Sequence, residues 1–159
     1  MIDSECEPDW KSFGMNCYNI SYNEMMNWTS AEESCKQKGA HLTSIHSIEK
    51  NEFLINNFIS VELAPMVFIG GLRANAWNDG TYFKYANWID GGGETTGKLN
   101  ISSCDYISCI AIHGYDGQWE PVPCDTEFSY ICKKSRQGNY MVFLTDRKIH
   151  DVNGDPTEK

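Results

Sequence analysis

The sequence predicts one α+β domain that is held together by disulfide bonds. Residues 28–39 and 47–59 have apolar side chains at the three- and four-residue spacing of amphipathic helices. Most of the later apolar segments are short and bounded by turn-forming residues, as strands are. Seven cysteines are scattered along the chain without a CxxC pair, which excludes the spacing of zinc ribbons and thioredoxin-like redox sites. The 159 residues fit a single domain of ordinary size.

Cysteine usage indicates an extracellular protein. Seven cysteines most simply form three disulfides and leave one over, and composition alone does not determine which of them pair. Three N-x-S/T sequons, at Asn19, Asn27 and Asn100, are acceptors for N-glycosylation in a secreted chain. The first residues lack the basic and apolar regions of a secretion signal, so we expect that a signal has been removed or that the chain is a fragment of a longer protein.

The charge and the hydropathy pattern narrow the set of partners. The formal net charge is −9, so nucleic acids and anionic membranes would repel the protein. No apolar run approaches the length of a membrane span. We therefore expect no nucleic-acid partner and no membrane-spanning segment.

The first helix is predicted directly before a short strand. Thr29 or Ser30 is the expected N-cap, which places Glu32 in the first turn, near the positive end of the helix dipole. Gly39 is expected to end the helix as a C′ residue. The expected buried face consists of Trp28, Ala31 and Cys35.

The second helix and the first buried strand follow. The helix is expected to begin near Ser47, and Pro65 ends any continuation. Its expected buried stripe consists of Leu54, Ile55, Phe58 and Ile59. Residues 67–72 (VFIGGL) are predicted as a buried strand, and the Asp-Gly pair at 79–80 predicts a hairpin or a tight loop between aromatic segments.

The second half of the chain contains a long loop and two late strands. Residues 89–108 are rich in glycine, serine, threonine and acidic residues, and a loop of that length usually carries function or is disordered. Strands are predicted around CIAIHG and EFSYICKK. Between them lies GQWEPVPC, in which Pro121 and Pro123 fix φ, so we expect a stiff, turn-like connection with Trp119 buried rather than an ordinary paired strand.

Motifs for catalysis are weak, and we expect a binding protein rather than an enzyme. GGETTGK has P-loop spacing, but Leu99 occupies the position of the magnesium-binding Ser or Thr. DVNGD resembles the start of a calcium-binding loop, but Pro156 replaces the required glycine. None of the four histidines lies in an HExxH motif or beside a plausible nucleophile.

The cysteine-containing segments carry the strongest signal. CEPDWKSFGMNCY places two cysteines eleven residues apart, WTSAEESC opens the first helix, and FIGGL and DGTYFKYANW follow in order. CIAIHGYDGQWEPVPCDTEFSYIC then completes the series. This combination resembles the C-type lectin-like domain in its long form, with an N-terminal hairpin, and in general character the nematode-type secreted lectins. The resemblance covers residues 4–134 and leaves 135–159 as a polar tail or linker.

The resemblance implies a fold and a disulfide pattern. The fold is α+β, with two helices packed on two small antiparallel sheets and a long ligand-facing loop at residues 89–108. The implied disulfides are Cys6–Cys17, Cys35–Cys132 and Cys109–Cys124. Cys104 is then left over, either as a free thiol or as an interchain disulfide in a homodimer.

The resemblance also locates a calcium and sugar site, and here its motif is degenerate. Sugar-binding members carry Trp-Asn-Asp before a core cysteine and Glu-Pro-Asn or Gln-Pro-Asp in the long loop. In this chain Trp119 matches, but Glu120 and Pro121 replace the Asn and Asp, and the loop motif is absent. Calcium is therefore not a certain cofactor, and a weak, rearranged calcium site would use Asp90, Glu94, Asp105 and Glu120.

Two functions follow from the resemblance. The first is secreted glycan recognition, for example in innate immunity, with exposed aromatic side chains such as Trp77, Tyr106 and Tyr115 stacking on sugars unless they are buried. The candidate ligand-binding residues are Glu94, Asp105, Tyr106, Trp119 and Glu120. The second is protein recognition by an adhesion or antagonist module that binds neither sugar nor calcium.

Overall fold

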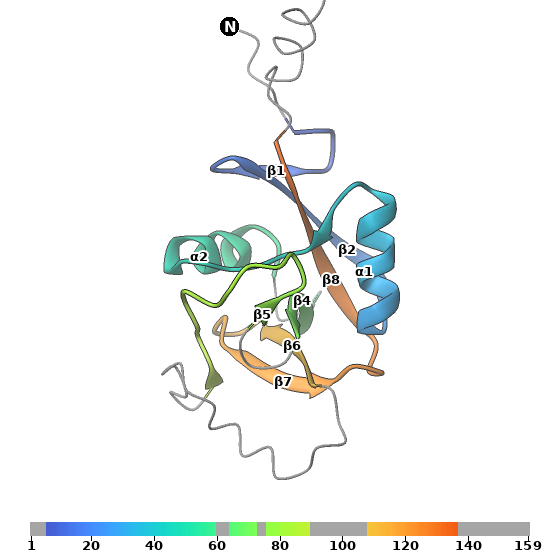
Figure 1. Ribbon diagram of the computed structural model, residues 1–159, viewed down its shortest axis with the longest axis vertical. Coiled ribbons are helices and arrows are strands. Elements are labelled where there is room, and N and C mark those ends of the chain that lie inside the picture. The colour runs from blue at the N-terminus through green and yellow to red at the C-terminus, as the bar shows by residue number, and fades with distance from the viewer. Residues whose placement is uncertain (1–5, 60–63, 73–75, 90–107, 137–159) are drawn as a thin grey trace, which may run out of the picture.

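Two helices and one mixed sheet form the part of the protein that the structure describes (Figure 1). The computed structural model describes residues 6–59, 64–72, 76–89 and 108–136. The helices are α1 (Trp28–Gln37) and α2 (Ile48–Asn57). The strands are β1 (Lys11–Phe13), β2 (Asn16–Met26), β3 (His41–Leu42), β4 (Met66–Leu72), β5 (Ala76–Trp77), β6 (Ser108–His113), β7 (Trp119–Pro123) and β8 (Phe128–Ser135). None of the helices in these described residues has the length and apolar character needed to cross a membrane.

The strands follow the order β1-β2-β8-β4-β6-β7, with β3 added at β8 and β5 at β4. All neighbours are antiparallel except β4 and β8, which pair in parallel at two positions, Val67 with Ser129 and Phe68 with Tyr130. This short parallel contact joins the two expected antiparallel parts into one sheet. The predicted α+β class and the N-terminal hairpin, formed by β1 and β2, are confirmed.

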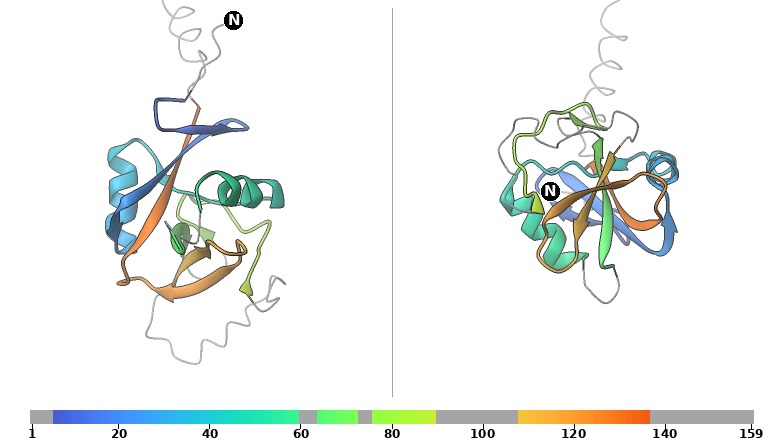
Figure 2. Two further views of the ribbon diagram at one scale, coloured as in Figure 1. Left: turned by 180° about the vertical axis from the view of Figure 1, so that it is seen from behind. Right: turned by 90° about the horizontal axis from the view of Figure 1, so that it is seen from below.

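The two helices lie on opposite sides of the long β2–β8 ladder (Figures 1 and 2). The first apolar core contains Leu54 of α2 together with Trp77, Trp119 and Ile131. The second core contains the buried face of α1 with inward residues of β4, β6 and β8. Strands β4, β6 and β8 therefore bury side chains on both faces, and the sheet is the central layer between the two cores.

Helix α1 begins earlier than the sequence predicts. Its N-cap is Asn27, whose Oδ1 accepts a hydrogen bond of 2.9 Å from the backbone N–H of Ser30, so the expectation of Thr29 or Ser30 is wrong. The chain enters the helix directly from β2, with Asn27 still in an extended conformation. Glu32 consequently lies on the buried face instead of in the first turn. The predicted end of the helix is confirmed, because Gly39 follows with a φ of +68°.

Helix α2 begins as predicted but ends two residues before its expected stripe does. Ser47 is the N-cap, and its side chain accepts from the N–H of Lys50 at 3.2 Å. The helix ends at Asn57, so Phe58 and Ile59 are buried as expected but lie beyond the last residue of the helix. Side chains from the N-terminal hairpin bind the carbonyl groups at this end, as described below.

GQWEPVPC contains a regular strand, which corrects the expected turn. Residues 119–123 form β7 and pair with β6 over five positions, including Ile110 with Pro121 and Ser108 with Pro123. β7 is the last strand in the order, and among the described residues only Trp88 bridges to its outer edge, at Trp119. Prolines are tolerated at an edge because their missing N–H can face away from the neighbouring strand. Two prolines at alternating positions therefore leave the pairing with β6 intact.

Three disulfides tie these elements together. They join Cys6 to Cys17, Cys35 to Cys132, and Cys109 to Cys124, which are the pairs that the family resemblance implies. The body extends to Arg136, whose N–H donates to the carbonyl of Met15 at 2.8 Å. The end of β8 is thus attached to the turn of the N-terminal hairpin.

Candidate functional site

The candidate site lies on the β6–β7 hairpin. Trp88 forms a parallel bridge with Trp119 at the start of β7, and Ser108 pairs with Pro123 at its end. The segment 90–107, which lies outside the described residues, therefore connects the two ends of β7. Glu120 lies between these two points, in β7.

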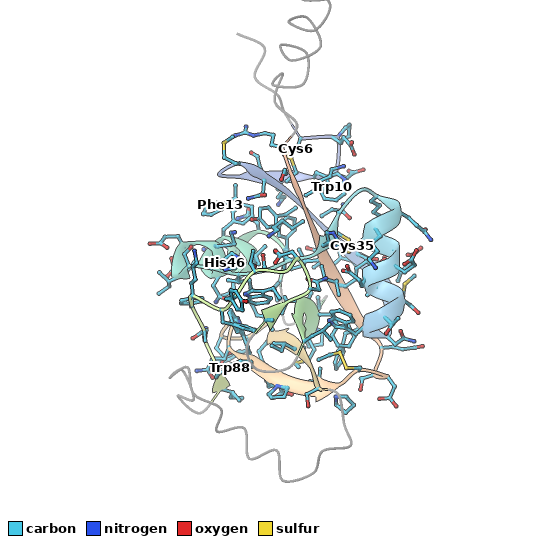
Figure 3. All side chains as sticks on the ribbon, in the orientation of Figure 1. Cys6, Trp10, Phe13, Cys35, His46 and Trp88 are labelled. Carbon is cyan, nitrogen blue, oxygen red and sulfur yellow. A yellow bond between two sulfur atoms is a disulfide. The ribbon has the colours of Figure 1, made fainter. Side chains whose placement is uncertain are left out.

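Trp119 has a structural role. Its ring is fully buried, and its Nε1 donates to Oδ1 of Asn51 in α2 at 2.8 Å. The edges of three aromatic rings pack against it at centroid distances of 5.4–5.7 Å, from Trp77, Tyr85 and Trp88 (the last labelled in Figure 3). Trp119 is buried as expected, and Trp77 has the buried role that the sequence left open for it. A ligand contact of either ring has no support in this burial. Both position the segments that carry the site.

Glu120 is paired with a histidine. Its Oε2 lies 2.9 Å from Nε2 of His113, and both side chains are partly exposed. Ala111 is opposite Glu120 in the register, and His113 is two residues farther along β6, so the three side chains share one face of the hairpin. Sequence reasoning missed this pair: the two residues flank a short glycine-containing turn, but their pairing depends on the strand register.

The described residues do not fit the family's calcium site. Glu120 would be one ligand, but its carboxylate is engaged by His113, and Pro121 has no side-chain oxygen. Nowhere in residues 6–59, 64–72, 76–89 and 108–136 do three or more His, Cys, Asp or Glu side chains converge as a metal site would require. The described residues by themselves therefore do not form a calcium site.

The turn between β6 and β7 presents one aromatic ring to solvent. Tyr115 is 84% exposed at this turn. The turn is fixed to the body, since the carbonyl of Gly117 accepts from Asn51 Nδ2 at 3.1 Å and from Asn87 Nδ2 at 2.8 Å. Gly117 has a φ of +70°, and a Cβ there would lie 1.9 Å from Cδ1 of Ile55. Only glycine fits this close approach to α2, so the tyrosine is held on a rigid hairpin.

Several predicted site residues lie outside the described residues. These are Asp90, Glu94, Asn100, Cys104, Asp105 and Tyr106. Their convergence on Glu120, the glycosylation of Asn100 and the state of Cys104 all stay predictions. The two other sequons are described: Asn27 is the cap of α1, and Asn19 lies in β2.

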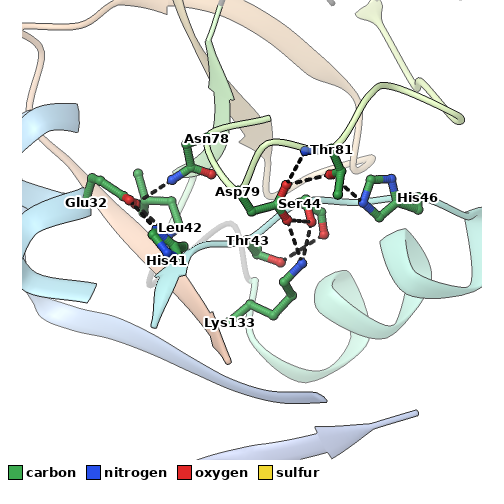
Figure 4. Close-up of polar contacts among 10 residues, drawn as sticks. All are labelled: Glu32, His41, Leu42, Thr43, Ser44, His46, Asn78, Asp79, Thr81 and Lys133. Carbon is green, nitrogen blue, oxygen red and sulfur yellow. Dashed lines mark hydrogen bonds and ion pairs between the residues drawn. The ribbon is translucent and has the colours of Figure 1, made fainter. Parts of the chain in front are cut away.

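A buried carboxylate connects α1 to the turn after β5, and sequence reasoning placed it wrongly. Glu32 is 7% exposed. Its Oε1 lies 2.6 Å from Nδ1 of His41, and its Oε2 accepts from the N–H of Leu42 at 2.8 Å and from Nδ2 of Asn78 at 2.5 Å (Figure 4). The carboxylate thus joins three segments of the chain. This gives His41 a structural role rather than a ligand role.

A second polar cluster centres on Asp79. Its Oδ2 accepts from Ser44 Oγ at 2.5 Å and pairs with Lys133 Nζ at 3.0 Å, while its Oδ1 accepts from the N–H of Thr81 at 3.0 Å (Figure 4). Burial alone would raise the pKa of this carboxyl, but the hydrogen bonds from Ser44, Thr81 and Lys133 outweigh it and hold the pKa below its usual range. Asp79 is therefore charged at all physiological pH values and fixes the turn after β5 to β8.

His46 completes this cluster as a neutral side chain. Thr81 Oγ1 donates to Asp79 Oδ1, so His46 Nε2 donates to Thr81 Oγ1 at 3.0 Å. His46 Nδ1 is then unprotonated, and it is buried with no hydrogen-bond partner among the described residues. Burial lowers the pKa of this imidazole, and the nearby ammonium groups of Lys50 and Lys133 lower it further.

The position of His46 predicts a loss of stability in weak acid. Because its pKa is lower in the folded than in the unfolded state, the unfolded chain binds the proton first as the pH falls below about 6.5. Neutral His46 therefore contributes fully to the free energy of unfolding above that pH, and this contribution is lost as the pH falls toward the pKa of His46 in the folded state. We expect the free energy of unfolding to decrease more steeply between pH 7.5 and pH 5 in the wild type than in His46→Gln, measured by urea denaturation. Equal slopes would contradict this account.

Comparisons with known proteins agree with this architecture. The Lectin C-type domain model matches residues 24–134. Human C-type mannose receptor 2 is 27% identical over 139 residues, which is 86% of this chain but 9% of that protein, so the chain spans less than a tenth of this relative. The carbohydrate-recognition domain of the mouse scavenger receptor C-type lectin is 27% identical with a TM-score of 0.68, and the match covers 84% of this chain and 100% of that one.

A second solved structure matches this chain with the same sequence identity and nearly the same TM-score. It is a calcium-independent type II antifreeze protein, 27% identical with a TM-score of 0.67, and the match covers 84% of this chain and 96% of that one. The family match spans more than half of the chain and includes both helices, the β6–β7 hairpin and β8. The chain therefore belongs to the C-type lectin domain family.

Proposed function

We propose that this protein is a secreted recognition module that binds glycans at the β6–β7 hairpin and the adjoining segment 90–107, without the calcium site of its family. The family consists of binding modules, and one solved relative is named as a carbohydrate-recognition domain. The observation that carries the proposal is the His113–Glu120 pair beside the exposed ring of Tyr115. Three disulfides support an extracellular location.

The hairpin offers both kinds of group that sugar binding needs. The ring of Tyr115 is a flat apolar face on which the C–H groups of a pyranose can stack, and it adds a hydroxyl. The side chains of His113 and Glu120 are partly exposed. Nε2 of His113 is itself buried, so the carboxylate of Glu120 is the group that can accept hydrogen bonds from sugar hydroxyls. Tyr106, Glu94 and Asp105 of the long segment are proposed as further contacts. The rigid attachment of the turn to α2 reduces the entropy that binding would cost.

The same pair explains why we propose calcium-independent binding. To hold calcium, Glu120 would have to leave His113 and be joined by Asp90, Glu94 and Asp105. Calcium needs six to eight oxygen ligands, and Pro121 supplies no side-chain oxygen. Such a rearranged site would be weak, at dissociation constants of about 0.1–1 mM or higher, which is the range of extracellular modules.

A glycan array with protein secreted from eukaryotic cells tests the proposal. We expect binding to a subset of glycans that persists when a chelator removes calcium. Tyr115→Ala should weaken this binding by about three- to tenfold, because an aromatic stacking contact is worth about 0.5–1.5 kcal/mol. Tyr82→Ala is the matched control, since Tyr82 is also highly exposed but lies in the turn after β5.

Three outcomes would overturn the proposal. Binding that is abolished by the chelator would show that calcium is a required ligand and that Glu120 leaves His113. If no glycan is retained while the protein remains folded, the second function predicted from the sequence, protein recognition, becomes the better explanation. Equal losses in Tyr115→Ala and Tyr82→Ala would place the site elsewhere on the surface.

A further inference from the structure

A groove of about 750 Å³ runs along β2, on a part of the molecule that the proposed glycan site does not use. Ligand-binding pockets usually have volumes of about 300–1,000 Å³. Six consecutive residues of β2, from Asn19 to Glu24, contribute to its lining. The remaining lining residues are Asp9, Trp10, Lys11, Lys38, Asn57 and Phe58.

The groove exists because the outer edge of β2 is uncovered there. β1 pairs only with residues 16–18 of β2, although the strand continues to Met26. Among the described residues, no other strand pairs with this edge. Unpaired edges promote pairing with other chains, and proteins commonly cover or charge them.

The walls of the groove are fixed by side-chain contacts. Lys11 Nζ donates to the carbonyl of Asn57 at 3.1 Å, and the hydroxyl of Tyr22 donates to the carbonyl of Phe58 at 2.5 Å. These bonds attach the N-terminal hairpin to the end of α2. The ammonium nitrogen of Lys134 lies over the ring of Trp10 (labelled in Figure 3), 4.2 Å from the ring centroid. The groove is therefore preorganised by the protein.

A glycosylation sequon forms part of this wall. Asn19-Ile20-Ser21 has the N-x-S pattern, and all three residues line the groove. Asn19 is partly exposed, and its Nδ2 donates to the carbonyl of Asp9 at 2.9 Å. After glycosylation this nitrogen still carries one hydrogen, so it can still donate one hydrogen bond.

We propose that Asn19 carries an N-linked glycan whose first sugars lie in the groove and cover the free edge of β2. The transfer takes place on the unfolded chain: Nδ2 of Asn19 bonds to the anomeric carbon of a lipid-linked oligosaccharide, loses one proton, and displaces the lipid pyrophosphate. When the domain folds, the attached sugars are already beside the groove. Docking is then intramolecular and occurs at a high effective concentration.

The chemistry of the lining fits a saccharide. Aromatic rings that can pack on sugar C–H faces alternate with amides and charged groups that can bind hydroxyls. Tyr22 is 37% exposed, so part of its ring is available although its hydroxyl is already bound. Acidic and basic groups are both present, as Glu24 and Lys38 illustrate, which suits a neutral polyhydroxylated ligand.

The sequon at Asn27 provides a matched comparison within the same chain. Asn27 is the N-cap of α1, and it does not line the groove. A glycan attached there keeps Oδ1 free for the capping bond to Ser30 and starts from a residue outside this groove. The rate at which an enzyme releases the Asn27 glycan is therefore the reference for an N-glycan that this groove does not protect.

The first test compares the two glycans on the native protein from eukaryotic cells. Glycopeptide mass spectrometry should find Asn19 occupied. An endoglycosidase should release the Asn19 glycan about tenfold more slowly than the Asn27 glycan, which corresponds to about 1.4 kcal/mol of docking. After denaturation the two should be released at similar rates. An unoccupied Asn19, or equal release rates from the native protein, would overturn the proposal.

A second test removes each glycan without touching the asparagine. Ser21→Ala abolishes the Asn19 sequon and also removes the bond from Ser21 Oγ to the carbonyl of Glu24, but it keeps the bond from Asn19 to Asp9. Thr29→Ala abolishes the Asn27 sequon but keeps the cap. Hydrogen exchange in residues 19–24 should be faster in Ser21→Ala and unchanged in Thr29→Ala. Enzymatic trimming of the folded wild type gives the same readout without any effect on folding. Unchanged exchange after both treatments would show that the glycan does not occupy the groove.

Discussion

Replacing both Cys35 and Cys132 with alanine is expected to lower the free energy of unfolding by about 4–5 kcal/mol. This disulfide joins residues 97 positions apart, so it removes more conformational freedom from the unfolded chain than the other two, whose partners are 11 and 15 positions apart. Both cysteines are also fully buried between α1 and β8. We expect a melting temperature at least about 10 °C lower, measured by thermal unfolding under non-reducing conditions.

The double substitution of Cys6 and Cys17 is the control for this prediction. That disulfide closes a loop of 11 residues, for which the same entropic relation gives a loss of about 3 kcal/mol. The ranking of the two variants is thus more informative than either value. If the N-terminal disulfide mattered as much as the long-range one, residual structure in the unfolded chain would outweigh loop length.

Replacing Glu32 with alanine is expected to cost about 3–5 kcal/mol, because it removes one partner of a buried charged network. The N–H of Leu42 and the amide of Asn78 would lose their acceptor, and water cannot easily replace it at a position that is 7% exposed. The loss is measured as the shift in urea midpoint at constant m-value. Glu33→Ala is the matched control, since Glu33 is the exposed neighbour and should change stability by about 0.5 kcal/mol or less.

Glu32→Gln separates the role of the charge from that of the acceptor. The amide keeps one acceptor oxygen but directs its NH₂ group toward one of the present donors, so an intermediate loss is expected. A wild-type midpoint in Glu32→Ala would show that the network does not support the fold. The same result would leave the burial of the Glu32 carboxylate on α1 unexplained.

Local signals explain which parts of the fold could be predicted. Ser47 and Gly39 mark helix ends through their own chemistry, so the sequence identified them correctly. The residue pattern of 16–26 does not itself predict a strand, because its outer half is exposed and lacks a clear apolar alternation, so the N-terminal hairpin was expected only from the family resemblance. The strand at Pro121 was mistaken for a turn, because its position at the edge of the sheet depends on the tertiary fold.

Prediction of the candidate site was limited in the same way, because contacts between strands depend on the tertiary fold. The degenerate calcium motif at Glu120 and Pro121 could be read from the sequence, because each replacement changes the ligand chemistry by itself. The pairing of Glu120 with His113 requires the register of β6 and β7, which the sequence did not provide. The burial of Trp77 likewise depends on which rings meet in the core, and the sequence alone left open whether Trp77 is buried or stacks on a ligand.

The β2–β8 ladder has a consequence for how the protein is made. Its strands come from the two ends of the domain, as the pairing of Asn19 with Cys132 shows, so β2 emerges from the ribosome long before its main partner. Such non-local pairing is slow, and translation proceeds at about 5–20 residues per second, so several seconds separate the two strands. During that interval Cys35 is a free thiol without its native partner. The domain therefore folds after synthesis, and its yield depends on an oxidising compartment in which premature disulfides can be reshuffled.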